Sequence, residues 1–372
     1  MICNIIYKFA PKKYLKPNCA RMIDATKINQ LADFVDNASV ITVVTHMKPD
    51  GDAMGSSLAM YHFLTSLNKG DVKIVLNDRY PSNLDFLVDK DTADNIVIHT
   101  EKPEAAAQRI TSSDLLICLD FNAFHRTDRL EESLKIASGK KILIDHHLSP
   151  ALENFNLVFS TQEISSASEL LFHILKAMPQ CEGKASKLPI RAAEALMTGM
   201  TTDTNNFNNS VYPSTFSMAS ELIAIGVDRD KILFNLFNRF GENRLRLLGT
   251  MLKDLLTITE DGVAYMVLDK ETLDRYQINE GDTEGFVNMP LSIDKVRMSL
   301  LLKEDGNRVR VSIRSKKGTS ANRCSKLHFN GGGHENAAGG RLNIPEDIQD
   351  ITEAGTYIEK HTHIYFTEEH ES

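Results

Sequence analysis

Short apolar runs that end in an ionisable residue constrain the fold of this chain more than any other feature of its sequence. Residues 41–45, 115–119 and 142–144 are such runs, rich in β-branched and aliphatic side chains. They lead directly into His46, Asp120 and Asp145. Open α/β sheets place their ligand sites at the carboxyl ends of the strands, so we expect these side chains to meet at one sheet edge.

The alternation of strand-like and helix-like segments predicts an α/β fold. Further strands are expected over residues 72–76 and 95–98, and helices over 25–37, 56–64, 104–110 and 128–136. This order indicates a mostly parallel N-terminal sheet flanked by helices. From residue 166 the pattern turns helical, and beyond about residue 257 it returns to strands. We therefore expect a second, smaller α+β domain.

The length of 372 residues is suited to two domains. We expect an N-terminal extension over 1–24, a metal-binding catalytic domain over 25–238, a linker helix over 239–256 and a substrate-binding domain over 257–372. The net charge of −8 argues against nonspecific binding of duplex DNA. The five cysteines are odd in number and widely spaced, which favours reduced thiols in the cytoplasm. No apolar run is long enough for a membrane span, and a homodimer is compatible with the sequence.

Four stretches of the chain carry acids and imidazoles that suit a metal centre: His46, Asp50, Asp52, Asp120, Asp145, His146, His147 and Asp203. Any one aspartate alone is commonly a helix cap or turn residue. Gathered at one sheet edge, they would repel one another or lie desolvated unless cations held them. Asp120 is placed to bridge two ions, with Asp50 and Asp52 aimed at neighbouring ions and His146 and Asp203 completing the set.

The composition of this ligand set indicates both the metal and the reaction. Oxygen ligands with a minority of imidazoles favour Mn²⁺, with Mg²⁺ as the alternative. Four carboxylates balance two divalent cations. Two such ions could activate a water and clamp phosphoryl oxygens, which suits phosphoester hydrolysis.

Three further residues have roles that the sequence leaves open. His147 could protonate the leaving oxygen or bind phosphate, or it could be an outer hydrogen-bond partner. Asp145 is better suited to orienting a histidine than to binding metal. Arg126, six residues beyond Asp120, could reach a phosphate or be an ordinary surface arginine.

A glycine-rich turn in the second domain forms the other constellation. Gly331, Gly332, Gly333 and His334 allow backbone N–H groups to approach an anion closely, and the alanines that follow are typical of a tightly packed helix N-terminus. Basic residues are concentrated just upstream, including Arg314. The turn and these cations predict that the second domain holds an anionic substrate.

Taken together, these motifs resemble the DHH/DHHA1 phosphoesterase family. The resemblance is carried by residues 46–56, Asp120, the Asp-His-His at 145–147, Asp203 and the Gly-Gly-Gly-His at 331–334. It implies an active site in the cleft between the two domains. It also implies one Mn²⁺ on His46, Asp50 and Asp120, a second on Asp52, Asp120, His146 and Asp203, and a nucleotide held by Arg314 and the 332–334 turn.

Within that family, the chain resembles in its compact length the class of enzymes that hydrolyses short oligoribonucleotides (nano-RNA) and 3′-phosphoadenosine 5′-phosphate. Short single-stranded RNA or a nucleotide is therefore the expected substrate. A soluble phosphodiesterase of cyclic or linear dinucleotides would use the same metal chemistry, and a protein that binds nucleotides without catalysis is a further alternative. The sequence does not separate these substrates, nor does it decide the direction of degradation.

Overall fold

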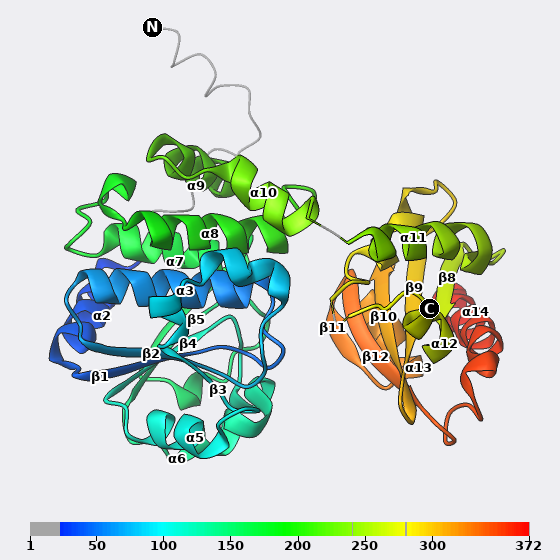
Figure 1. Cartoon of the computed structure of the whole chain (residues 1–372), viewed down its shortest axis with the longest axis horizontal. Helices are drawn as coiled ribbons and strands as arrows, with labels where there is room; N and C mark the ends of the chain where they lie inside the picture. The colour runs from blue at the N-terminus through cyan, green and yellow to red at the C-terminus, as the bar shows by residue number, and fades with distance from the viewer. Residues whose placement is uncertain (1–22, 240, 280, 372) are drawn as a thin grey trace, which may run out of the picture. The chain divides into compact units, whose positions relative to one another are not determined.

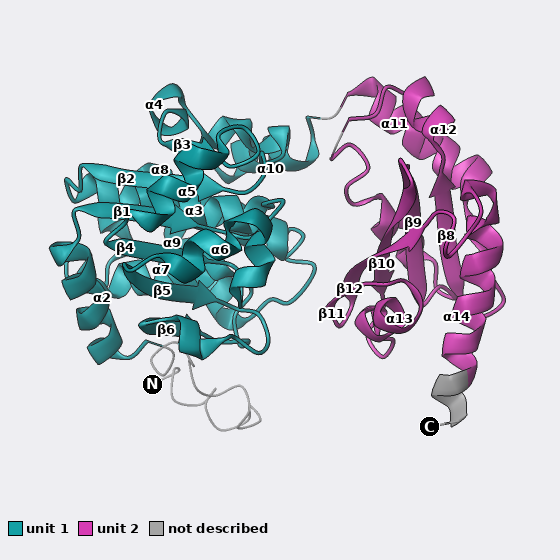
Figure 2. Cartoon of the chain, turned by 90° about the horizontal axis from the view of Figure 1, so that it is seen from below, with its two compact units in different colours: residues 1–239 teal, residues 240–372 magenta. Residues whose placement is uncertain are grey.

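The computed structural model of the chain describes residues 23–239, 241–279 and 281–371. The N-terminal extension expected over residues 1–24 lies almost wholly outside this range. The chain divides into two compact units, Met1–Arg239 and Phe240–Ser372, which Figure 2 colours separately. No helix within the described residues combines the length and the apolar surface that crossing a membrane requires.

Unit 1 is built on a six-stranded sheet in which every pairing is parallel, in the order β3-β2-β1-β4-β5-β6. The strands are β1 Val40–Val44, β2 Asp71–Leu76, β3 Ile96–Ile98, β4 Leu115–Leu119, β5 Lys140–Asp145 and β6 Leu157–Ser160. The predicted parallel sheet is thus confirmed. The strand order reverses between β1 and β4, which is where open α/β sheets place their ligand sites.

Helices cover both faces of this sheet because alternate strand residues point to opposite sides. Val43 packs into the larger core with α3, α7 and α8, whereas Val44 packs into a smaller core with α5 and α6. Figure 1 shows these two helix layers on either side of the strands. The helices of unit 1 are α2 Ala25–Asn37, α3 Gly51–Ser66, α4 Lys90–Ala93, α5 Pro103–Thr111, α6 Glu131–Ile136, α7 Ala167–Ala177, α8 Ile190–Asp203, α9 Pro213–Ala224 and α10 Arg229–Phe237.

Unit 2 has a six-stranded sheet in the order β11-β12-β10-β9-β8-β7, in which β8 and β9 are parallel and the other pairs antiparallel. Its core includes residues of α13 and α14 packed on the sheet. The strands are β7 Thr257–Ile258, β8 Val263–Leu268, β9 Met298–Asp305, β10 Arg308–Ser315, β11 Gly332–His334 and β12 Ala337–Asn343. The helices are α11 Glu242–Thr250, α12 Lys270–Arg275, α13 Ala321–His328 and α14 Ala354–Glu371.

The segment after the glycine-rich turn differs from the sequence prediction. Ala337 and Ala338 were expected to begin a helix, but they begin β12. This strand pairs with β10 on one side and with β11 on the other. The hydrogen bonds of two neighbouring strands therefore outweigh the helix preference of two alanines, because local propensity is a weak determinant beside tertiary pairing.

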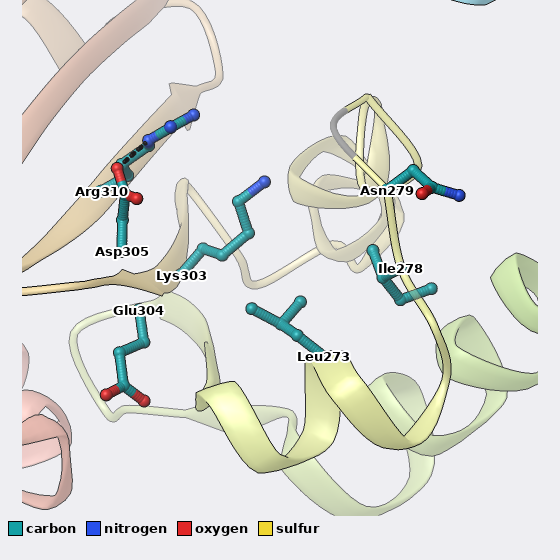
Figure 3. Close-up of a pocket in the computed structure, with 7 residues that line it drawn as sticks. All are labelled: Leu273, Ile278, Asn279, Lys303, Glu304, Asp305 and Arg310. Carbon is teal, nitrogen blue, oxygen red and sulfur yellow. Dashed lines mark hydrogen bonds and ion pairs between the residues drawn. The ribbon is translucent and has the colours of Figure 1, made fainter.

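A small cavity of about 140 Å³ lies in unit 2 beside the hairpin of β9 and β10. Figure 3 shows its apolar side, formed by Leu273 and Ile278, and the polar residues around it. Two of these, Asp305 and Arg310, form an ion pair of 2.7 Å. Ligand sites usually measure about 300–1,000 Å³, so this cavity is too small for a dinucleotide.

Candidate active site

The loop after β1 brings His46 and Asp50 to the carboxyl edge of the sheet. Asp50 is the N-cap of α3, and its Oδ1 accepts hydrogen bonds from the N–H groups of Asp52 (3.0 Å) and Ala53 (3.1 Å). The helix therefore begins at Gly51, five residues earlier than the predicted start at residue 56, because the cap satisfies its first donors. Nε2 of His46 lies 3.8 Å from Oδ1 of Asp50.

Asp52 is 2% exposed and is held by the N-terminus of α7. Its Oδ2 accepts a hydrogen bond from the N–H of Ala167 at 2.7 Å, and its Oδ1 accepts one from the N–H of Ser168 at 2.9 Å. The partial positive charge of a helix N-terminus favours an anion at this point. Even so, burial and the charge of Asp120 raise the pKa of Asp52 to about 7. A nearby cation would favour its ionised form.

Asp120 follows β4 and lies between two imidazoles. Its Oδ2 is 3.5 Å from Nε2 of His46, and its Oδ1 is 3.4 Å from Nε2 of His146. Burial alone would raise the pKa of Asp120, but the two neighbouring imidazoles hold it well below the usual range. Conversely, burial alone lowers the pKa of His146, while Asp120 raises it to about 10. The backbone φ of Asp120 is +62°, a conformation that aspartate tolerates better than most residues.

Asp203 ends α8 and completes the cluster. Its Oδ2 lies 3.6 Å from Nε2 of His146, which is also 4.0 Å from Oδ2 of Asp52. Burial and the like charge of Asp52 raise the pKa of Asp203 well above its ordinary value. The residues form three groups, in each of which the ligand atoms lie within 4.8 Å of one another: His46, Asp50 and Asp120; Asp52, His146 and Asp203; and Asp120, His146 and His147.

Asp145 contacts the second histidine of the Asp-His-His motif. It is completely buried. Its Oδ1 lies 2.7 Å from Nδ1 of His147, and its Oδ2 accepts the N–H of His147 at 3.1 Å. These two contacts fix the ring of His147 near Asp120, with Nδ1 of His147 at 3.7 Å from Oδ1 of Asp120.

Three glycines allow the helices that carry the acids to approach closely. A Cβ at Gly55 of α3 would lie 2.6 Å from the carbonyl oxygen of Ala195 in α8. A Cβ at Gly199 would overlap Ser168 and lie 2.9 Å from Oδ1 of Asp52, and one at Gly51 would overlap Thr202. The absence of side chains at these positions therefore brings Asp52 and Asp203 together.

Arg126 and the residues of the glycine-rich turn are not members of the three groups of candidate metal ligands. Arg126 belongs to a 3₁₀ helix, Phe124–Leu130, and its carbonyl oxygen accepts the N–H of Met47 at 2.8 Å. Arg314 and the turn belong to unit 2. The sheet register places His334, Ala337 and Arg314 in one row across β11, β12 and β10. Burial lowers the pKa of the Arg314 guanidinium, and the charge of Glu284 opposes that shift.

The donor set in unit 1 suits divalent cations. Oδ1 of Asp120 is buried and, among the described residues, has no well-aligned hydrogen-bond donor. A buried carboxylate oxygen without a donor costs free energy unless a cation occupies its lone pairs. The groups formed by His46, Asp50 and Asp120 and by Asp52, His146 and Asp203 each combine two carboxylates with one imidazole. Such oxygen-rich sets match Mn²⁺ or Mg²⁺ better than structural zinc, which prefers thiolates and imidazoles.

Sequence reasoning missed the residues that hold Asp52. Ala167 and Ser168 act through their backbone N–H groups, so their side-chain types carry no signal. Ser166 and Glu169, in contrast, do carry a sequence signal. A serine followed three residues later by a glutamate, before an apolar run, is the signature of a capping box. That signature predicts the start of α7, though not the carboxylate that its amides would bind.

Comparisons with known proteins agree with this geometry. The model named "DHH family, N-terminal domain" matches residues 40–200, and the model named "DHHA1 domain" matches residues 260–358. The crystal structure of an exopolyphosphatase-related protein from Bacteroides fragilis superposes with a TM-score of 0.84 at 35% identity, covering 92% of this chain and 97% of that one.

Two further relatives are similar in sequence. The chain is 26% identical over 306 residues to the bifunctional oligoribonuclease and PAP phosphatase NrnA of Bacillus subtilis, covering 80% of this chain and 87% of that protein. It is 30% identical over 203 residues to the cyclic-di-AMP phosphodiesterase GdpP of Geobacillus thermodenitrificans, covering 53% of this chain and 30% of that protein.

Proposed function

Because this chain belongs to the DHH family, carries a DHHA1 domain and is thus a hydrolase of phosphoester bonds, we propose that it degrades short oligoribonucleotides and dephosphorylates 3′-phosphoadenosine 5′-phosphate. The observation that most strongly supports this proposal is that six candidate metal ligands converge at one sheet edge: His46, Asp50, Asp52, Asp120, His146 and Asp203. The similarity to NrnA along most of both chains supports these substrates.

We assign two divalent cations, Mn²⁺ in preference to Mg²⁺, to the groups that share Asp120. His46, Asp50 and Asp120 would hold one ion, and Asp52, Asp120, His146 and Asp203 the other. When bound, such a pair supplies an activated water and neutralises charge on the phosphoryl oxygens. The protein keeps the ligands in place through the N–H groups of α7 and the N-cap of α3.

His147 is proposed to act on the leaving group. Asp145 fixes its ring by accepting the backbone N–H of His147 and contacting Nδ1. An imidazole held in this way can donate a proton to a departing oxygen. Arg126 and, in unit 2, Arg314 with residues 331–334 are proposed to bind the phosphates and the nucleotide, since guanidinium groups and glycine-rich backbone suit these anions.

The test compares hydrolysis of a 5′-phosphorylated dinucleotide, longer RNA and bisphosphorylated adenosine, with Mn²⁺ and with chelator. The inactive variant should be Asp120→Asn, because asparagine tolerates the positive φ at this position. The matched control is Asp128→Asn, an exposed aspartate with φ of +52°. We expect Asp120→Asn to lose more than the roughly 10–100-fold that removal of an outer-shell partner costs, and Asp128→Asn to retain activity. Full turnover in chelator would contradict the proposal.

Hydrolysis of a cyclic dinucleotide is the second candidate. The similarity to the phosphodiesterase GdpP favours it, although that similarity covers about half of this chain. A cyclic dinucleotide belongs in the same assay. Faster turnover of the cyclic substrate than of linear dinucleotide or bisphosphorylated adenosine would favour this candidate over the first.

A further inference from the structure

Glu169 is a completely buried carboxylate in the first turn of α7. Its Oε2 accepts hydrogen bonds from the N–H of Ser165 at 3.1 Å, from the hydroxyl of Ser165, and from the hydroxyl of Thr215 in α9 at 2.7 Å. Its Oε1 lies 3.7 Å from Nε2 of His173. Burial would raise the pKa of Glu169, but hydrogen bonds from His173 and Ser165 hold it below its usual value. The group is therefore an anion inside the protein.

The turn that Glu169 holds is the one that holds Asp52. Ser166 caps α7, and its Oγ accepts the N–H of Glu169 at 2.9 Å. The next two residues, Ala167 and Ser168, donate their N–H groups to the two oxygens of Asp52. In an ordinary capping box the acid accepts the N–H of the capping residue itself. Here Glu169 reaches one residue further back, to Ser165, so it fixes the residue that precedes the cap.

This arrangement connects a buried anion to a proposed metal ligand through a single turn, Ser165–Ser168. Backbone N–H groups orient a carboxylate only while their own turn keeps its geometry. Thr215 belongs to α9, so Glu169 also ties the turn to a second helix. A carboxylate is costly to bury, and a hydrogen bond to an ion is stronger than one between neutral groups. Three such bonds converge on one oxygen beside the turn.

We propose that Glu169 is a positioning residue for Asp52: by fixing the Ser165–Ser168 turn, it sets the affinity of the site formed by Asp52, His146 and Asp203 for a divalent cation. The inference rests on the metal centre of the proposed function. It predicts a difference between the two ion sites, because Asp52 is held by this turn, whereas Asp50 is the N-cap of α3 and His46 lies in the loop after β1. Glu169 should therefore influence one site much more than the other.

The experiment is a calorimetric titration of the chelator-treated full-length protein with Mn²⁺, accompanied by thermal unfolding of the metal-free protein. The variants are Glu169→Ala, which removes the acceptor, and Glu169→Gln, which keeps an acceptor oxygen of the same shape. The matched control is Glu221→Gln. Glu221 accepts from Nζ of Lys176 at 2.8 Å and so also ties α7 to α9, at the other end of α7.

We expect Glu169→Ala to weaken one class of Mn²⁺ site by roughly 10–100-fold, as loss of an outer-shell partner does in metal sites, and to leave the other class intact. Glu169→Gln should recover part of that loss, and Glu221→Gln should bind Mn²⁺ like the unaltered protein. If Glu169→Ala does not fold, a weakened site in Glu169→Gln decides the question.

Two results would overturn the inference in distinguishable ways. Variants at Glu169 that unfold at lower temperature but bind Mn²⁺ with unchanged affinity would show that this residue serves packing alone. An unaltered protein that binds no Mn²⁺ would instead refute the metal centre itself and, with it, the proposed function.

Discussion

Gly332→Ala should weaken substrate binding without harming the fold, although its two neighbours are also glycines. A Cβ at Gly331 would overlap the carbonyl oxygen of Gly339, and one at Gly333 would lie 2.5 Å from the carbonyl oxygen of Ala337 on a backbone with φ of +155°. These two glycines are therefore required by the turn. A Cβ at Gly332 would meet only side chains, at ordinary distances of 3.5–3.7 Å. Within the described chain, folding does not require a glycine there.

The expected magnitudes follow from that geometry. Because alanine restricts the unfolded chain more than glycine does, the unfolding free energy should stay level or rise by about 0.4–1 kcal/mol. If a substrate phosphate approaches the backbone at Gly332, a methyl group blocks one hydrogen bond to a charged group, worth about 1.5–3 kcal/mol. That loss corresponds to roughly 10- to 150-fold in KM, with kcat little changed.

The assay is Mn²⁺-dependent hydrolysis of a 5′-phosphorylated dinucleotide, with thermal unfolding measured on the same samples. Gly249→Ala is the control, since a Cβ at this position in α11 would meet nothing within 4 Å. It should leave KM unchanged. An unchanged KM for Gly332→Ala would refute the reasoning that a ligand approaches this strand, and a large loss of stability would refute the steric part of it.

Three other predictions concern unit 1 and Arg314, which is proposed to bind the substrate. Burial lowers the pKa of His46 and of His146, but Asp120 raises these pKa values to about 9 and about 10, above the ordinary 6.5. The two imidazoles should therefore stabilise the metal-free protein most below pH 6.5, and this stabilisation should be lost as pH rises through 9. The melting temperature measured in chelator should follow this pH dependence, and Asp120→Asn should flatten it. Gly55→Ala should lower the free energy of unfolding by about 1–3 kcal/mol, measured by chemical denaturation, because its Cβ would approach a backbone oxygen. Gly70→Ala should leave that free energy nearly unchanged, because its Cβ would meet nothing within 4 Å. Arg314→Lys should raise KM by about tenfold at constant kcat, because lysine lacks the planar set of donors that a guanidinium group offers. An unchanged KM would show that Arg314 does not bind the substrate.

The strands of unit 1 and the convergence of its acids could be predicted because both depend on short-range patterns. An apolar run followed by His46, Asp120 or Asp145 indicates a strand end, and parallel strands bring such ends together. The predicted start of α3 at residue 56 is wrong by five residues, because Asp50 caps the helix as well as being a candidate metal ligand. One carboxylate can serve both functions, and periodicity alone does not reveal the first.

Features that depend on distant segments were not predictable in this way. The helix expected at Ala337 is a strand because β10 and β11 lie on either side of it. The hydrogen bonds from the first turn of α7 to Asp52 join residues more than a hundred positions apart in the sequence. Their donors are backbone N–H groups, which almost every residue possesses. Only the fold decides which amides meet which carboxylate.

The proposed metal ligands of unit 1 come from four segments between His46 and Asp203. Two metal ions bound there would therefore join distant parts of the chain as a covalent cross-link does. The described cysteines, Cys118, Cys181 and Cys324, form no such link. Closing long loops restricts the unfolded chain, and ligands that bind only the folded state shift the folding equilibrium. Metal supply should thus govern how long this protein survives proteases as well as how fast it turns over substrate.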